Sequence, residues 1–293
     1  MKILVVGSTG LLGSAILSCS EHDIVGTYLE HAPWKKGSVK LDITDREQVF
    51  KTVQRVCPDS IIHCAALIDT ETCEEKPDVA KKLHVDGTKN LVDAAKDNRA
   101  HFVYMSTEVV FDGKKGNYTE HDVPNPLNVY ARTKLEGERC ALEYSNSCSV
   151  RTNLFGWNYL HKESVAEWML HALRNRKEIT LFDDVYFTPI LTTDLASILM
   201  QMVKRRFRGL YHVGGAQRIS KYGFGLELAK VFGLEPSMFK PIHVREKNFK
   251  GERPLDTSLD CSKIQEELGL VLPNITQGLE RFKNTEGKHK WKA

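Results

Sequence analysis

The first half of the chain alternates between short apolar runs and stretches with helical spacing of apolar residues. Runs such as 2–6 and 101–105 show no polar alternation, which is typical of parallel strands buried on both faces. A third short strand is expected to end at Asp42 and Ile43, and Thr44 to Glu47 resembles a capping box that opens a helix. Strands are therefore predicted at 2–6, 23–28, 60–66, 101–105 and 148–151, with helices at 11–19, 44–56, 78–97 and 130–144.

A glycine-rich turn joins the first strand to the first helix. Gly7, Gly10 and Gly13 have the spacing G-x-x-G-x-x-G. Gly7 can form the tight turn, Gly10 lets the backbone approach a pyrophosphate, and Gly13 permits close packing of helix on strand. The strand-turn-helix context predicts a dinucleotide cofactor, NADPH or NADH, contacted by Gly7, Thr9, Gly10, Leu11, Leu12 and Gly13.

The adenosine end of the cofactor has two alternative sets of candidates. Glu30 follows Gly10 by twenty residues, where an acidic side chain would meet the ribose of NAD. Lys35 and Lys36 could instead neutralise the 2′-phosphate of NADP, and a simple solvated loop is equally compatible with the pattern. The ends of the third and fourth strands add further predicted cofactor contacts, of which the small residues could equally serve core packing: Asp42, Ile43, Cys64, Ala65 and Ala66.

The regular alternation ends near Arg151. Beyond it we expect helices at 163–174, 193–203, 220–232 and 260–268, an extended segment at 178–182 and a strand at 209–213. The predicted fold class is α/β, a Rossmann-type doubly wound parallel sheet with a smaller C-terminal substrate-binding lobe. The expected boundaries are 1–151 for the dinucleotide-binding domain and 152–293 for the lobe, which should be interleaved with the sheet.

A tyrosine and a lysine stand four residues apart at the start of the helix predicted at 130–144. On a helix Tyr130 and Lys134 share one face, so the ammonium could favour the phenolate. Lowering a phenol pKa by roughly three units takes about 4 kcal/mol, and such a tyrosine can exchange a proton near neutral pH. Taken alone the spacing is also that of an ordinary surface pair. The strand at 101–105 brings Ser106, Thr107 and Glu108 to its carboxyl end, where open α/β sheets bind ligands.

Composition narrows the classes of partner. The chain has 293 residues, 41% hydrophobic and 27% charged, with a net charge of +3. Part of the excess lies in Lys288, Lys290 and Lys292, which resemble a solvated tail more than a nucleic-acid patch. No apolar run approaches the ~18 residues of a membrane span, and no signal peptide precedes the first strand. We therefore expect a cytoplasmic protein with neither nucleic acid nor membrane as partner. Seven scattered cysteines, with no zinc spacing, predict reduced thiols and no metal.

Several motifs together resemble the extended short-chain dehydrogenase/reductases, and among them most closely the dTDP-4-dehydrorhamnose reductases. The resemblance runs nearly from end to end of the chain and is more specific than any single motif. Its parts are the glycine turn, 104–107 (YMST), 110–113 (VFDG), 126–138 (PLNVYARTKLEGE), Arg151-Thr152, 209–213 (GLYHV) and 253–259 (RPLDTSL).

The resemblance implies transfer of a hydride from NAD(P)H to the C4 ketone of a nucleotide-linked 4-keto-6-deoxyhexose. Thr107 would hydrogen-bond the carbonyl oxygen and Tyr130 would protonate it. Lys134 would hold the nicotinamide ribose and lower the tyrosine pKa. Substrate contacts are expected from Thr107, Glu108, Asn153 and Arg253, of which Arg253 could form an anion-binding cluster with Lys247 and Lys250. A homodimer is also possible.

The chain departs from the family pattern in its expected sugar pocket. Glu108-Val109 stands where the family commonly has Asp-Tyr, and Asn153-Leu154 where it has Ser-Trp. These changes leave the predicted catalytic residues intact. An NAD-dependent nucleotide-sugar epimerase or dehydratase is an alternative. A second is a non-catalytic regulatory protein, because the β subunit of methionine adenosyltransferase resembles the same family.

Overall fold

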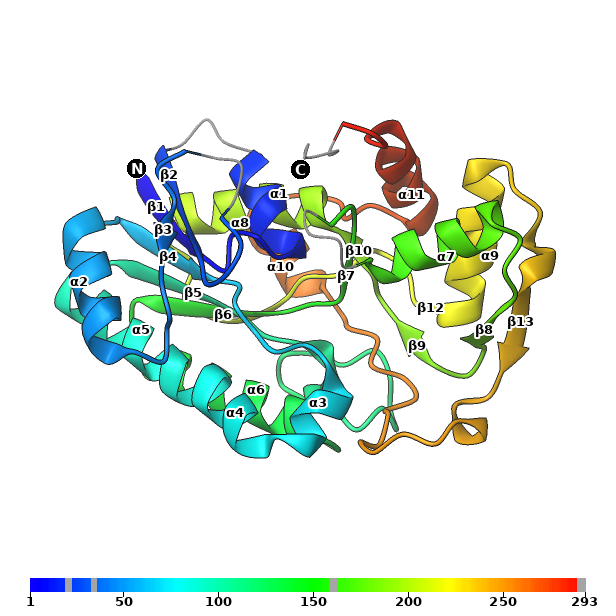
Figure 1. Cartoon of the computed structure of the whole chain (residues 1–293), viewed down its shortest axis with the longest axis horizontal. Helices are drawn as coiled ribbons and strands as arrows, with labels where there is room; N and C mark the ends of the chain where they lie inside the picture. Colours follow the sequence, from blue (N-terminus) through cyan, green and yellow to red (C-terminus); the bar gives the residue numbers. More distant parts are fainter. Residues whose placement is uncertain (19–22, 33–35, 159–162, 289–293) are drawn as a thin grey trace.

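The computed structural model describes residues 1–18, 23–32, 36–158 and 163–288 (Figure 1). Four residues discussed above lie outside these ranges: Cys19, Lys35, Lys290 and Lys292. Within the described residues, no helix combines the length and apolar composition needed to cross a bilayer. The six cysteines in the described ranges carry free thiols.

A seven-stranded parallel sheet forms the larger unit of the molecule. Its strand order is β11-β6-β5-β4-β1-β2-β3, and every pair in it runs parallel. The predicted doubly wound Rossmann-type sheet is thereby confirmed. The strands are β1 (Lys2–Val6), β2 (Asp23–Tyr28), β3 (Val39–Lys40), β4 (Ser60–His63), β5 (His101–Met105), β6 (Ser147–Arg151) and β11 (Gly209–His212).

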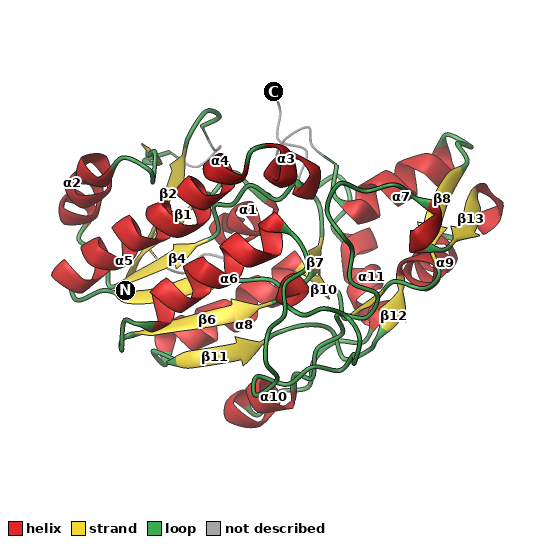
Figure 2. Cartoon of the chain, turned by 90° about the horizontal axis from the view of Figure 1, so that it is seen from below, coloured by secondary structure: helices red, strands yellow, loops and turns green. Residues whose placement is uncertain are grey.

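Helices cover both faces of this sheet (Figure 2). Successive residues of a strand point to opposite faces, so Ile3 packs in one core cluster and Leu4 in the other. Both side chains are fully buried. One face is covered by α1 (Leu11–Ser18), α8 (Thr192–Lys204) and α10 (Ser262–Leu268), and the other by α2 (Arg46–Val56), α5 (Gly87–Asp97) and α6 (Val129–Leu142).

A smaller lobe lies beside the sheet, toward the carboxyl ends of its strands (Figure 1). Its core contains Phe155, whose ring meets those of Phe224 and Phe282 edge to face. The lobe alternates along the chain with β11, α8 and α10, which belong to the sheet. It contains α7 (Val165–Arg174), α9 (Lys221–Phe232), α11 (Ile275–Asn284), β8 (Ile179–Phe182) and β13 (Phe239–Ile242), and its remaining short strands are β7 (Leu154–Phe155), β9 (Tyr186–Phe187), β10 (Ile190–Leu191) and β12 (Ile219–Ser220).

Two expectations about the segment before α2 are wrong. The third strand ends at Lys40, because the Asp42 carboxylate accepts from the backbone N and the hydroxyl of Thr44 and turns the chain. The N-cap of α2 is Asp45 instead of Thr44, and its carboxylate accepts from the backbone N of Gln48 at 3.0 Å. The Thr44 hydroxyl is already used by Asp42.

The helix expected at 78–97 is interrupted. It consists of α4 (Pro77–Lys81), a π-helical turn at Lys82–Asp86 and α5. Such turns often occur at functional sites, and this one contains His84, discussed below. Elements not anticipated from the sequence include α3 (Thr70–Glu75) and the 3₁₀ turns at Glu108–Val110, Pro236–Met238 and Val244–Glu246.

Candidate active site

The glycine turn after β1 has a geometry that larger residues could not adopt. Gly7 has φ +80°, and a Cβ there would approach the Ala65 backbone N to 2.7 Å. At Gly13 a Cβ would lie 2.3 Å from the Gly7 carbonyl oxygen. At Gly10, by contrast, a Cβ would meet only that oxygen, at 3.5 Å. The turn is therefore packed tightly at both ends and open at Gly10, where the first N–H groups of α1 are free of helical partners.

The predicted residues at the end of β4 lie beside this turn. Ala65 is the neighbour that closes on Gly7, and the Cys64 backbone N donates to the Val6 carbonyl at 2.8 Å. Ala66, like these two, is only partly buried. Burial raises the pKa of the Cys64 thiol to about 12, so it remains protonated. The small residues thus pack against the turn and also keep its surroundings accessible.

The residues predicted to meet the adenosine differ in their availability. Glu30 is exposed just beyond β2, and its carboxylate lies 4.0 Å from Nε2 of His31. The Asp42 carboxylate is engaged by Thr44, as described above. Ile43 is buried, and its carbonyl accepts from Nδ2 of Asn90 at 3.0 Å. Glu30 and Lys36 are therefore the described candidates whose side chains are exposed to solvent.

Tyr130 and Thr107 come together at the carboxyl edge of the sheet. Tyr130 is the second residue of α6, whose N-cap is Asn128; the Asn128 side chain accepts from the backbone N of Ala131 at 2.9 Å. The Thr107 side chain, directly after β5, interacts with the half-buried Tyr130 and acts to lower its pKa. The Thr107 hydroxyl also lies 3.4 Å from Oε2 of Glu108.

The expected effect of Lys134 on the Tyr130 pKa is not found. Burial and the Glu108 carboxylate raise the pKa of Tyr130, and Lys134 is not among the groups that shift it. The Lys134 ammonium instead donates to the Met105 carbonyl at 2.7 Å and lies 4.1 Å from the centre of the Tyr104 ring. Burial lowers the pKa of Lys134 itself to about 7. In this structure the phenol is therefore neutral at physiological pH and can donate a proton.

His84 is a site residue that the sequence analysis missed. Its Nε2 accepts from the Leu67 backbone N at 3.0 Å, so Nδ1 carries the hydrogen and donates to the Thr133 hydroxyl at 2.8 Å. Burial lowers the pKa of His84 to about 3, which keeps the ring neutral. The ring meets that of Tyr130 edge to face at 5.8 Å. His84 thus packs against Tyr130, and nothing in the local sequence signals this contact over 46 positions.

A pocket of about 340 Å³ opens beside these residues, between the sheet and the smaller lobe. It brings together three of the predicted substrate contacts, Glu108, Asn153 and Arg253. Asn153 Nδ2 donates to Oε1 of the buried Glu108. The remaining walls come from residues that were not predicted, most of them apolar: Val109, Phe182, Val185, Phe187, Lys221, Val244, Phe249, Pro254 and Thr257. Phe182, Phe187 and Phe249 give the pocket aromatic surface. This chain lacks the Tyr and Trp that the family commonly has after the catalytic Thr and after Arg-Thr.

The expected basic cluster around Arg253 does not form. Arg253 Nη2 pairs with Oε1 of Glu71 at 3.0 Å, and its guanidinium lies 4.8 Å from the centre of the Phe249 ring. The ammonium of Lys250 pairs with Glu75, and the exposed Lys247 does not line the pocket. Carboxylates of α3 thus divide the predicted cluster, and Arg253 is its one member in the pocket wall.

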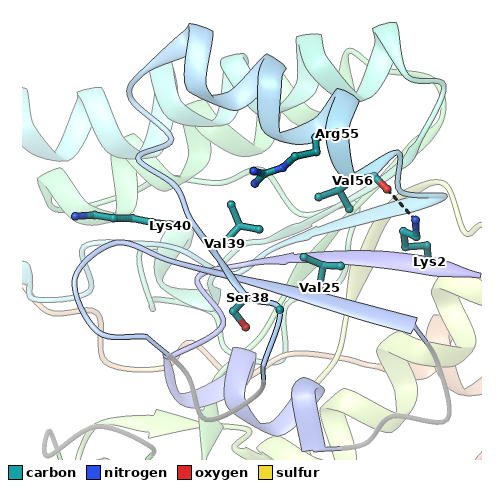
Figure 3. A pocket seen from close by; sticks show the side chains of 8 residues that line it. Lys2, Val25, Ser38, Val39, Lys40, Arg55 and Val56 are labelled. Carbon is teal, nitrogen blue, oxygen red and sulfur yellow. Dashed lines mark hydrogen bonds between the residues drawn. The ribbon is translucent and has the colours of Figure 1, made fainter.

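A second hollow, of about 710 Å³, lies away from these residues (Figure 3). It lies between the β2 and β3 edge of the sheet and the end of α2, with Lys2, Lys40 and Arg55 in its wall. None of the predicted site residues is among the described residues that line it.

The Rossmann-type sheet, with Thr107, Tyr130 and Lys134 at its carboxyl edge, defines the class of the extended short-chain dehydrogenase/reductases. The chain belongs to the RmlD substrate binding domain family, whose model matches residues 1–287.

Proteins similar to this chain include a regulatory subunit and reductases. Methionine adenosyltransferase 2 subunit beta of Rattus norvegicus is 32% identical over 280 residues, covering 92% of this chain and 83% of that protein. A probable low-salt glycan biosynthesis reductase, Agl14 of Haloferax volcanii, is 27% identical and covers 95% and 96%. Among solved structures, dTDP-4-dehydrorhamnose reductase of Bacillus anthracis in complex with NADP has a TM-score of 0.87 at 26% identity, covering 97% of this chain and 98% of that one.

Proposed function

We propose that this protein is an NAD(P)H-dependent reductase of a nucleotide-linked 4-keto-6-deoxyhexose. Membership of the RmlD family and the likeness to a reductase solved with NADP support a nicotinamide cofactor and a sugar-nucleotide substrate. The observation that carries the proposal is the interaction of Thr107 with Tyr130 beside the pocket that Glu108 lines, with buried Lys134 on the next turn of the same helix.

The turn after β1 fits the pyrophosphate of such a cofactor. Open space above Gly10 and the unpartnered N–H groups at the start of α1 suit a phosphate group. A bound nicotinamide dinucleotide supplies the hydride. Glu30 and Lys36, both exposed, are the described side chains that could distinguish the ribose of NAD from the phosphorylated ribose of NADP. The choice between NADH and NADPH, which differ in the 2′-phosphate of this ribose, is part of the proposal.

The residues of the chain would position and protonate the ketone. The Thr107 hydroxyl donates a hydrogen bond to the carbonyl oxygen, and Tyr130 transfers its proton to the same oxygen as charge develops there. The raised pKa of Tyr130 keeps the phenol protonated before the reaction. Lys134, which donates to the Met105 carbonyl, would contact the nicotinamide ribose.

A second candidate is a non-catalytic regulatory role. The observation that favours it is the 32% identity to methionine adenosyltransferase 2 subunit beta. That likeness covers the same domain and leaves the Thr, Tyr and Lys residues unexplained. Turnover separates the two candidates, because a regulatory protein would oxidise no NAD(P)H with a sugar nucleotide.

The test is single-turnover oxidation of NADPH or NADH with a panel of dTDP- and UDP-linked 4-keto-6-deoxyhexoses. Tyr130→Phe keeps the ring and removes the proton, so the rate should fall by about 10²–10⁴ with cofactor affinity nearly unchanged. Tyr144→Phe is the matched control, since Tyr144 donates to the Ala100 carbonyl at 3.0 Å, away from the site. No oxidation by the wild type, or wild-type rates in Tyr130→Phe, would eliminate the mechanism.

A further inference from the structure

The pocket contains an ammonium and a carboxylate supplied by different units of the fold. Lys221 is the first residue of α9 in the smaller lobe, where its backbone N donates to the Val185 carbonyl at 3.0 Å. Glu108 follows β5 of the sheet. Both side chains line the same pocket. The two charges therefore face one cavity from the two units that form it.

Lys221 has an unusual set of contacts for a lysine. Its Nζ lies 3.3 Å from the centre of the Phe187 ring, among the apolar walls of the pocket. Within the described part of the chain, no carboxylate oxygen lies within 4.0 Å of this ammonium, the distance limit for an ion pair. Its hydrogen-bonding capacity is thus unused on the side that faces the pocket.

Each carboxylate oxygen of Glu108 has one polar neighbour and can accept a further hydrogen bond. Asn153 donates to one carboxylate oxygen, and the Thr107 hydroxyl lies 3.4 Å from the other. Burial lowers the pKa of Lys221 to about 8, and Glu108 acts against this change. Burial raises the pKa of Glu108, and Lys221 acts against that. The two groups thus interact across the pocket without an ion pair.

We propose that Lys221 and Glu108 form a recognition site for one hydroxyl of the substrate sugar, with the hydroxyl oxygen accepting from Lys221 and its hydrogen donated to Glu108. This inference rests on the proposed function. Because the Thr107 hydroxyl, which contacts the ketone in that function, lies 3.4 Å from Oε2 of Glu108, we assign the hydroxyl to the ring carbon next to the ketone. Lys221 is then a specificity-determining residue contributed by the smaller lobe.

The charges of the pair determine which substituents fit. A hydroxyl both donates and accepts, so it satisfies the carboxylate and the ammonium together. A carboxylate substituent would meet repulsion from Glu108, and an ammonium would meet repulsion from Lys221. A sugar lacking the hydroxyl would leave the Lys221 ammonium and one acceptor position of the buried Glu108 carboxylate without that partner, and a site rejects a ligand that leaves its polar groups unpaired. The substrate class is therefore a neutral sugar with a free hydroxyl beside its ketone.

The experiment compares two substrates in matched variants. The NADPH-dependent kcat/KM is measured for a 4-keto-6-deoxyhexose nucleotide and for its 3-deoxy analogue, which lacks the neighbouring hydroxyl. The wild type should prefer the hydroxylated sugar by about ten- to a hundredfold, the range for a hydrogen bond to a charged group. Lys221→Met should reduce this preference to a few-fold. Lys263→Met is the control, because Lys263 also lies over a tyrosine ring, that of Tyr211 at 4.2 Å, outside the pocket.

A second variant tests the same site even if Lys221→Met fails to fold. Glu108→Gln keeps the size of the side chain, and it should reduce the same preference. An unchanged preference in Lys221→Met or Glu108→Gln, checked as folded by circular dichroism, overturns the hydroxyl site and leaves the proposed reductase standing. Equal use of both sugars by the wild type does the same. A wild type that reduces neither sugar overturns the proposed function, and this inference with it.

Discussion

Replacement of Lys134 by methionine should change how the stability of the protein depends on pH. Lys134 is only 3% exposed, and burial lowers its pKa from 10.5 to about 7, with Glu138 and Cys64 acting against burial. Between these two pKa values the unfolded chain carries a proton on this lysine that the folded chain has released. The free energy of unfolding of the wild type therefore rises with pH in this window.

The size of the effect follows from the shift. One pKa unit corresponds to about 1.4 kcal/mol, so protonated Lys134 destabilises the fold by up to about 5 kcal/mol below pH 7. Between pH 7.5 and 9.5 about 2–3 kcal/mol of this cost should disappear from the wild type. Methionine has a similar unbranched stem and no charge, so Lys134→Met should lose this part of the pH dependence. The lost hydrogen bond to Met105 adds a constant offset and leaves the slope unaffected.

The assay is urea unfolding of the wild type and Lys134→Met at pH 6.5, 7.5, 8.5 and 9.5. From pH 7.5 to 9.5, the free energy of unfolding of the wild type should rise by about 2–3 kcal/mol relative to that of Lys134→Met. Lys263→Met is the control, since its ammonium donates to the Leu210 carbonyl at 2.8 Å and is only part-buried. Parallel stability curves for wild type and Lys134→Met would refute the assignment of a buried lysine that loses its charge near neutrality.

Three further predictions concern the two ligand sites and the core. Gly10→Val should weaken NAD(P)H binding in a fluorescence titration, with a native far-UV spectrum, because the side chain would occupy the open space above the turn; unchanged affinity would contradict the assignment. Arg253→Ala should weaken sugar-nucleotide binding about tenfold in calorimetry and spare the cofactor, since a guanidinium can release Glu71 to pair with a diphosphate; the reverse pattern would show that the lobe does not bind the nucleotide. Arg151→Met should lower the free energy of unfolding in urea by about 3–5 kcal/mol, because it leaves Glu138 charged, 2% exposed and without its bidentate partner. The double variant with Glu138→Met should lose less stability than Arg151→Met alone. A loss under about 1 kcal/mol in Arg151→Met would contradict this explanation.

The sheet was predictable because its signals are local. The apolar run of β1, the glycine turn and the first turns of α1 occupy consecutive positions, and each residue's role follows from its neighbours. The two-residue strands of the smaller lobe have no such signal. Ile219–Ser220 is a strand because it pairs with Tyr186–Phe187 more than thirty positions away, and Ile190–Leu191 pairs with Leu154–Phe155. Their identity is set by tertiary contacts that periodicity does not encode.

The candidate site was predictable to the same extent. Thr107, Tyr130 and Lys134 stand in recognisable motifs, and their roles stay predictions that the proposed assays test. His84 and Lys221 reach the site from a π-helical turn and from the head of a distant helix. The direction of the Tyr130 pKa shift could not be foreseen, because i and i+4 spacing gives proximity of backbone positions and not the direction in which a lysine points. Here the Lys134 ammonium donates to the Met105 carbonyl at 2.7 Å.

The position of β11 in the sheet limits the order in which a growing chain can fold. β6 pairs with β5 on one side and with β11 on the other, so Arg151 has its strand neighbour His212 sixty-one residues later. During synthesis, residues 152–208 must emerge first, which takes roughly 3–11 s at ribosomal rates of 5–20 residues per second. Throughout that interval β6 is an open sheet edge of five residues that are all buried in the finished protein. A fragment ending at 151 should therefore self-associate, because β11, the strand that covers this edge, begins only at Gly209.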